Sequence, residues 1–197
     1  MQENPLKHPR LELAAAEKAI GGMRRAQSLD DFEVEWRAYL NCIEKLWQKV
    51  ERSCQHVCGV FAPWQGKYHR LRKKDMLLRY LKQARDADNH SIQDVTKIQP
   101  GSRAYRFANP QGGYIKHMEI RNGAVVHYEG DPMTVEETLP HPVAVPVKNN
   151  GEWFNPPSSH LELPVTTHHP VDLAVLGLMF YSGYIAEVEK KFFAVMP

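Results

Sequence analysis

The sequence lacks most of the features that assign a chain to a common protein class. It has only three cysteines, Cys42, Cys54 and Cys58, an odd number that does not make a complete disulfide framework. Its formal net charge is +2, so the overall charge indicates neither a nucleic acid nor a membrane surface as a partner. A Gly-rich phosphate loop and the G-x-S-x-G and H-E-x-x-H signatures are missing, which excludes the commonest nucleotide-binding and hydrolase motifs.

No apolar run is long enough to predict a membrane span. The longest run, residues 173–186, is interrupted by Ser182 and two glycines, whereas a span needs about 20 residues. The first ten residues include Lys7 and Arg10 with no apolar segment behind them, which argues against a secretory signal. We therefore expect a soluble, cytoplasmic protein with reduced thiols.

Two helices are predicted in the first quarter of the chain. Residues 9–27 have Pro9 in the first turn and an Ala-rich middle, both favourable to a helix. Ser28 and Asp31 resemble a capping box that opens a second helix at 29–53. Apolar residues follow there at spacings of three and four: Phe32, Trp36, Leu40, Ile43, Trp47 and Val50.

Two further helices are predicted later in the chain. Residues 54–66 contain Gly and Pro and are expected to form a connector, which leads to a strongly basic third helix at 67–89. The last helix, 171–193, is apolar nearly all round until Ala186. A helix of that composition is predicted to be buried on several sides.

Between these last two helices the composition changes to that of strands and turns. Three segments have strand composition: 102–108, 113–119 and 124–128. Asn122-Gly123 between the last two is typical of a hairpin turn. Residues 132–170 contain eight of the 14 prolines, so this stretch is expected to form edge strands, extended loops or turns.

The order of elements predicts an α+β fold, a four-helix bundle with a Pro-rich antiparallel β segment inserted between helices 3 and 4. The last helix can bury its apolar surface only by packing back on the first three. We therefore expect residues 1–197 to form a single domain. The bundle would comprise residues 9–92 and 171–193, and the β insertion about 97–165.

The strongest candidate site lies at the end of the basic helix. Arg85 is a permanent cation with a planar fork suited to phosphate, and His90 can act as a general acid or base near neutral pH. Asp86 precedes His90 by four residues and could fix its tautomer. On an ideal helix Arg85 and His90 point about 140° apart. They converge only if the helix breaks near Asn89 or if a dimer axis unites them.

The string R-D-x-x-x-H at the end of a helix in a small bundle resembles the HEPN superfamily. The resemblance implies a metal-independent ribonuclease or RNA-binding protein of the toxin or defence type, working as a homodimer without a cofactor. It implies that Arg85 binds the scissile phosphate, that His90 takes part in 2′-hydroxyl chemistry and that Asp86 is the polar residue beside the arginine. The β segment departs from the all-helical pattern of that superfamily. The wider layout is similar to that of bacterial and phage-borne proteins to which we attach no activity.

A structural interpretation of the same residues stays open. Arg85 and Asp88 could form an ion pair at the helix end, with His90 as a polar residue after the cap. The basic helix also has two interpretations, a solvated surface or a track for the phosphates of RNA. The candidate nucleic-acid-binding residues are Lys67, Arg70, Arg72, Lys73, Lys74, Arg79 and Lys82.

Two clusters have residue types that bind zinc, although we expect no metal at either. The first is Cys42, Cys54, His56 and Cys58, and the second is His141, His160, His168 and His169. Cys42 follows the apolar pattern of the second helix beside Ile43, where a buried thiol is common.

A second functional hypothesis is a non-catalytic module that binds a protein partner or a ligand. In that case the β insertion makes the contact and the bundle supports it. An exposed apolar patch within residues 102–165 would favour this hypothesis.

Overall fold

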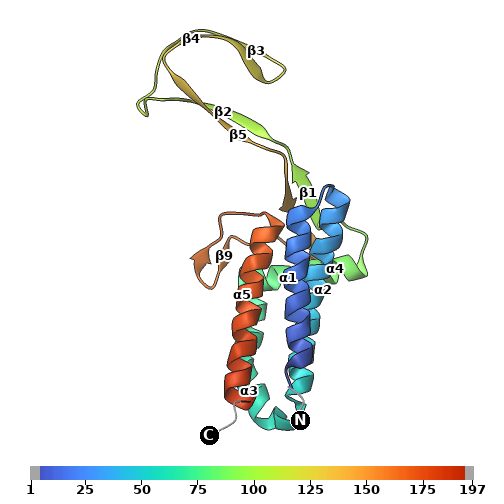
Figure 1. Cartoon of the computed structure of the whole chain (residues 1–197). Coiled ribbons are helices and arrows are strands. Elements are labelled where there is room, and N and C mark those ends of the chain that lie inside the picture. The colour runs from blue at the N-terminus through green and yellow to red at the C-terminus, as the bar shows by residue number, and fades with distance from the viewer. Residues whose placement is uncertain (1–4, 194–197) are drawn as a thin grey trace. The chain divides into compact units, whose positions relative to one another are not determined.

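The computed structural model describes residues 5–193 and has an α+β fold, as predicted. The chain divides into two compact units rather than the single domain expected (Figure 1). The helical unit contains the chain up to Lys97 and again from Pro142 onward, and the second unit, which we call the arm, is Ile98–His141.

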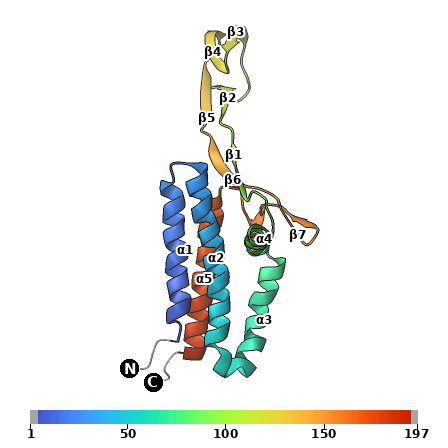
Figure 2. The same ribbon diagram turned by 90° about the vertical axis from the view of Figure 1, so that its right-hand side faces the viewer.

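The helical unit contains five α-helices where four were predicted. They are α1 (Lys7–Arg25), α2 (Leu29–Ser53), α3 (Cys58–Lys74), α4 (Met76–His90) and α5 (Pro170–Val188). A 3₁₀ turn, Gln55–Val57, precedes α3, and α5 continues into a π-helical turn, Glu189–Phe193. Figure 2 shows α1, α2 and α5 side by side with α3 next to them, while α4 is seen end-on and crosses the others.

The predicted third helix is two helices because the chain turns at Asp75. The backbone of Asp75 is extended (φ −66°, ψ 130°), and its carboxylate accepts a hydrogen bond from the Leu78 N–H at 2.9 Å. This contact is an N-cap, which begins α4 in a new direction. The leucines that predicted one continuous helix therefore lie on two helices.

The predicted connector at 54–66 is mostly helical. Pro63 lies inside α3 and does not end it. Phe61, Gln65 and Tyr68 are buried at spacings of four and three. Their burial outweighs the helix-breaking tendency of Pro63 and Gly59, because tertiary packing commonly overrides local propensity.

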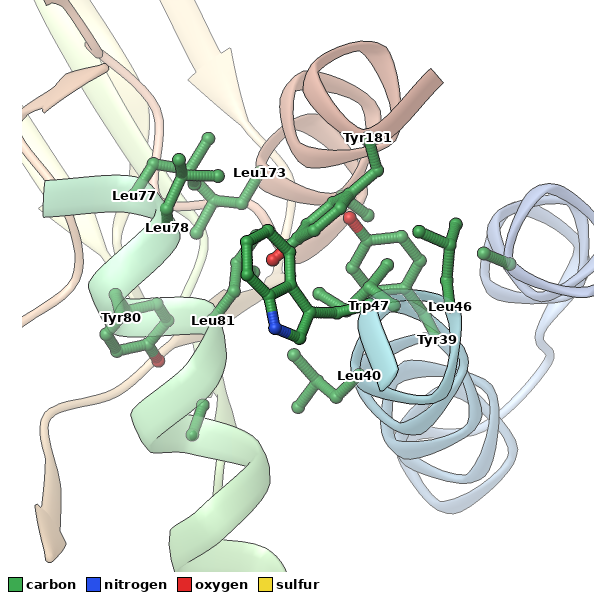
Figure 3. Packing of buried hydrophobic residues seen from close by; sticks show 14 of the residues in the cluster. Tyr39, Leu40, Leu46, Trp47, Leu77, Leu78, Tyr80, Leu81, Leu173 and Tyr181 are labelled. Atoms are coloured by element: carbon green, nitrogen blue, oxygen red, sulfur yellow. The ribbon is translucent and has the colours of Figure 1, made fainter. Parts of the chain in front are cut away.

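The core of the helical unit is formed by apolar and aromatic side chains of all five helices. The apolar stripe predicted for residues 29–53 is confirmed, since all six of its members are at most 5% exposed. Figure 3 shows Trp47 and Tyr39 of α2 facing Leu81 of α4 and Tyr181 of α5. At the start of α2, the Ser28 hydroxyl accepts from the Asp31 N–H at 3.1 Å, which confirms the predicted cap.

Helix α5 is buried on one side only, not on several as predicted. Its buried residues recur at spacings that define one face: Pro170, Val171, Leu173, Ala174, Gly177, Tyr181, Tyr184, Ile185 and Val188. Within residues 5–193, Pro170–Phe193 is the one helical stretch long and apolar enough to cross a membrane. It packs against α1, α2 and α4, as the core helix of a soluble protein does.

Four short strands of the Pro-rich segment belong to the helical unit. They form two antiparallel pairs, β7 (Val147–Asn149) with β8 (Glu152–Phe154) and β9 (Ser159–His160) with β10 (Leu163–Pro164). The strands between α4 and α5 run from Thr96 to Pro164, which agrees with the predicted insertion at about 97–165, and those from Pro142 onward belong to the helical unit. Where the chain passes between the units, β1 (Thr96–Gln99) pairs with β6 (His141–Ala144).

The arm consists of two antiparallel strand pairs. Strand β2 (Ser102–Phe107) pairs with β5 (Met133–Thr138), and β3 (Ile115–Arg121) pairs with β4 (Ala124–Gly130). Asn122 and Gly123 have φ angles of 51° and 78°, the left-handed values of a two-residue hairpin turn. The predicted hairpin is therefore confirmed.

Candidate functional site

The guanidinium of Arg85 is engaged by groups of its own chain. Its Nη1 lies 2.8 Å from the Asp86 carboxylate, and its Nε donates to the Asn41 side-chain oxygen on α2 at 3.4 Å. The side chains of Arg85 and Asp86 are 27% and 20% exposed. Arg85 thus joins α4 to α2, and an incoming phosphate would compete with Asp86 for it.

The ion pair proposed between Arg85 and Asp88 is not formed. Asp88 instead pairs with Arg37 of α2 at 2.9 Å, and Arg37 also pairs with Glu33 at 3.2 Å. Asn89 donates to the same Asn41 oxygen that Arg85 contacts. The contacts of Asp88 and Asn89 fix the end of α4 on α2.

His90 is the last residue of α4 and is exposed. Helix α4 continues unbroken to His90, so Arg85 and His90 keep the wide angular separation of an ideal helix. Between residues 5 and 193 no hydrogen bond links His90 to Asp86, whose partner is Arg85. One chain alone does not bring the two predicted catalytic side chains together, and their catalytic role stays a prediction.

The seven candidate nucleic-acid-binding residues do not form one surface. Arg72 is 8% exposed and pairs with Glu44 of α2, with its guanidinium 4.3 Å from the centre of the Trp47 ring. Because Arg72 is buried, residues 67–89 expose fewer positive charges than their sequence contains. Tyr181 of α5 also contacts this pair and has its pKa raised, chiefly by burial.

Two more of the candidate cations are paired at the surface. Lys67 pairs with Glu187 at 2.9 Å, and Arg79 pairs with Glu152 at 2.6 Å. The remaining four have exposed side chains and no ion-pair partner within residues 5–193: Arg70, Lys73, Lys74 and Lys82.

Two of these cations, Lys73 of α3 and Lys82 of α4, act on the same side chain, His69. The pKa of His69 is lowered, first by burial and then by the positive charges of Arg72, Lys73 and Lys82, although Glu51 acts in the opposite direction. The effect shows that cations of both helices reach the same region.

The structure places Asp75 and His160 together, two residues that no sequence pattern connects. His160 Nδ1 lies 2.9 Å from Asp75 Oδ1, and the Leu161 N–H donates to Oδ2 at 2.7 Å. Burial raises the pKa of Asp75, but the hydrogen bonds from His160, Leu161 and Leu78 outweigh it and hold that pKa below its ordinary value.

The turn next to this pair has an unusual backbone. Leu161 and Glu162 have φ angles of 48° and 68°, left-handed values that non-glycine residues rarely adopt. The bond from the Leu161 N–H to Asp75 helps hold the turn in place. Strained turns occur often at functional sites, but here the described contacts serve to fix β9 and β10 on α4.

Neither predicted zinc cluster is assembled among residues 5–193, where no three His, Cys, Asp or Glu side chains are grouped to hold a metal ion. Cys54 is buried, and burial raises the pKa of its thiol to about 12. His160 pairs with Asp75 and therefore has a partner other than His141, His168 and His169.

The arm, Ile98–His141, is exposed or partly exposed along its whole length. None of the residues 98–141 is buried. Apolar side chains with more than 40% exposure are Ile98, Tyr114, Ile115, Ile120, Val126, Val135 and Leu139. Soluble domains rarely expose so many apolar residues on a short segment without a binding role.

Comparison with protein-family models, curated proteins and solved structures found no match. The arguments for a function therefore come from the surfaces and contacts of the chain itself.

Proposed function

We propose that the chain is a non-catalytic protein-interaction module whose arm binds an extended segment of a protein partner. The observation that carries the proposal is the complete absence of buried residues in 98–141. A two-stranded ribbon without a core is only marginally stable in water. A partner that covers the ribbon would supply the burial that the arm lacks.

The β2–β5 ribbon has two unlike faces. Because directly paired residues share a face, Tyr105 and Val135 lie with Phe107 and Met133 on one side, next to the ion pair Arg103–Glu137 at the end of the same face. The opposite side carries polar and small residues: Ser102, Ala104, Arg106, Thr134, Glu136 and Thr138. In antiparallel sheets the apolar side is the one that packs against another layer. The four-residue apolar face is therefore the contact surface that we propose.

The strand edges offer the second element of recognition. The arm's sheets each contain two strands, so every strand has one edge without a ladder partner. An extended segment can add there by main-chain hydrogen bonds, while apolar pockets on the face select its side chains.

The charges of the arm favour a protein partner over a nucleic acid. Its cations are paired with carboxylates of the arm itself, as in Arg103–Glu137 at 2.9 Å and Lys116–Glu129 at 2.7 Å. A surface neutralised in this way has little attraction for phosphates, whose binding depends on free Lys and Arg.

The test is selection of peptides from a random library on the purified full chain. We expect wild type to enrich peptides with alternating apolar residues, and Val135→Lys to lose that enrichment by placing a charge on the apolar face. Thr134→Lys is the matched control, since it adds the same charge on the opposite face. Equal enrichment by all three proteins, or none by wild type, would contradict the proposal.

The HEPN-like ribonuclease is the second candidate, favoured by exposed His90 and the free cations of α3 and α4. It requires a second chain to bring His90 and Arg85 together. We expect His90→Ala to abolish cleavage of RNA by the purified protein, with His168→Ala, another exposed histidine, as the control. Unchanged cleavage in His90→Ala, or no cleavage by wild type, would remove this candidate.

A further inference from the structure

Helix α5 presents a continuous stripe on the side opposite its buried face. Six residues follow one another there at spacings of four, three, four, three and four: Asp172, Leu176, Met179, Gly183, Ala186 and Lys190. We call them the α5 stripe. Leu176 is partly buried and the other five are exposed, with Met179 67% exposed. This alternation of four and three is the pattern by which one helix packs along another.

The charges of the α5 stripe stand only at its two ends, with opposite signs. Asp172 lies in the first turn of α5 and Lys190 lies in the π-helical turn that follows it. The four positions between them carry no charge. A stripe with this order is complementary to a copy of itself that runs in the opposite direction.

We infer that the α5 stripe binds the α5 stripe of a second copy of the chain, antiparallel about a two-fold axis. A single register pairs all six positions. Asp172 faces Lys190 of the second copy, Leu176 faces Ala186, and Met179 faces Gly183, each pair occurring twice. Such an isologous contact closes on itself and yields a dimer.

The shapes of the central residues fit this register. A Cβ atom added to Gly183 would meet no atom within 4 Å, so the surface above this residue is open. Met179 is the largest side chain of the stripe and is unbranched, which lets it adapt to an irregular gap. In the antiparallel register each Met179 lies over the Gly183 of the other copy.

The end charges are available for the contact. Lys190 forms no ion pair within residues 5–193, although its charge acts on Glu187, which pairs with Lys67. Asp172 accepts one hydrogen bond, from the Thr167 hydroxyl at 2.9 Å. A carboxylate has further acceptor sites, so this bond leaves Asp172 able to bind a lysine.

The surface beside the stripe widens the contact toward α1. A shallow hollow of about 370 Å³ is lined by Leu13 and Glu17 of α1 and by Leu178, Met179 and Ser182 of α5. Apolar atoms dominate this lining. The inference rests on α5 and α1 alone and is independent of what the arm binds.

The first experiment measures the mass of the full chain in solution by sedimentation over a wide concentration range. We expect a reversible dimer for wild type and a dissociation constant raised about tenfold or more in Met179→Glu, which buries like charges at the centre. Leu11→Glu is the control, because Leu11 is similarly exposed (56%) on α1 outside the stripe. A monomeric wild type, or a dimer that Met179→Glu leaves unchanged, overturns the inference.

The second experiment tests the antiparallel register with charge reversals at the two ends. Asp172→Lys alone and Lys190→Glu alone place like charges opposite each other, so each variant should be mainly monomeric. An equimolar mixture of the two restores both attractive pairs and should form the heterodimer. Circular dichroism checks that each variant is folded. If the mixture stays monomeric, the register is wrong. If monomeric wild type co-sediments with phosphatidylcholine vesicles, the stripe faces lipid and the dimer is excluded.

Discussion

Asp75 takes part in several side-chain hydrogen bonds, and its side chain is only 6% exposed. It caps α4 through the Leu78 N–H and binds both His160 and the Leu161 N–H. We expect Asp75→Ala to lower the free energy of unfolding by about 1–3 kcal/mol, the range for a lost cap plus charged hydrogen bonds. Urea denaturation measures this loss of unfolding free energy. Asp94→Ala is the control, because Asp94 is exposed.

The same substitution has a defined pH dependence. The pKa of Asp75 is lower in the folded chain than in the unfolded one, where a carboxyl titrates near about 4. Its contribution to stability is therefore present above about pH 4 and is lost as the pH falls through the lower folded value. The difference in unfolding free energy between wild type and Asp75→Ala should shrink below pH 4. A difference that grows in acid would contradict this account.

Arg72 and Glu44 form a second residue-scale test, because their side chains are only 8% and 12% exposed. Arg72→Met leaves Glu44 buried without its cation, and we expect a loss of about 3–5 kcal/mol in unfolding free energy. Arg79→Met is the control, since the Arg79–Glu152 pair is exposed and should cost less than about 1 kcal/mol. The double variant Arg72→Met, Glu44→Leu should recover much of the loss. Equal costs for Arg72→Met and Arg79→Met would contradict the structural role of Arg72.

Residue types predicted local contacts well and long-range ones poorly. Ser28 as a cap and Asn122-Gly123 as a turn depend on neighbours a few residues away, and both are confirmed. The burial of Arg72 and its partner Glu44 could not be predicted, because the two are far apart in sequence. The same reason hid the pair of Asp75 and His160.

At the scale of elements, two glycines of α5 provide a matched comparison. A Cβ atom on Gly177 would lie 2.4 Å from the Tyr39 hydroxyl and 2.7 Å from Leu81 Cδ1, whereas one on Gly183 would meet nothing within 4 Å. We expect Gly177→Ala to destabilise the chain by about 1–3 kcal/mol through overpacking. Gly183→Ala should leave stability unchanged or raise it by up to about 1 kcal/mol through helix propensity. Thermal unfolding measures the stability of both variants. A larger loss of stability in Gly183→Ala than in Gly177→Ala would contradict the packing of α5.

The spacing of apolar residues predicted an element correctly where that spacing was compatible with only one structure. The stripe of α2 is the clearest case, since spacing and burial agree along its whole length. The pattern failed between residues 67 and 89 because a cap at Asp75 interrupts the backbone without disturbing the spacing of the leucines. It also failed for α5, whose apolar composition indicated more burial than the helical unit provides.

At the scale of the whole molecule, the two units should differ in local stability. The arm has no buried residue, whereas α2 contributes eight buried side chains to the core. Arm amides should therefore exchange their hydrogens through local opening of small free energy, and the amides of α2 only through unfolding of the helical unit. Hydrogen exchange followed by mass spectrometry measures the protection of these amides. Equal protection of the arm and of α2 would contradict the absence of a core in the arm.

The α+β class and the existence of a β insertion followed from the order of patterns along the chain. The assignment of residues 142–165 to the helical unit could not be predicted, because the sequence of a short strand does not indicate the surface against which the strand packs. The candidate site at Arg85 and His90 was located from residue types alone. The pairing of Arg85 with Asp86, instead of a bond from Asp86 to His90, and the contact of Arg85 with Asn41 became visible only with the fold.

The most direct test of the arm as a binding surface is site-specific photo-crosslinking in the native host cell. A photoreactive amino acid at Val135, on the apolar face, should give a discrete adduct with a partner protein. The same amino acid at Thr134, on the opposite face, should give none. Absence of an adduct at Val135, or equal adducts at both positions, would contradict the proposal that this face of the arm binds a protein.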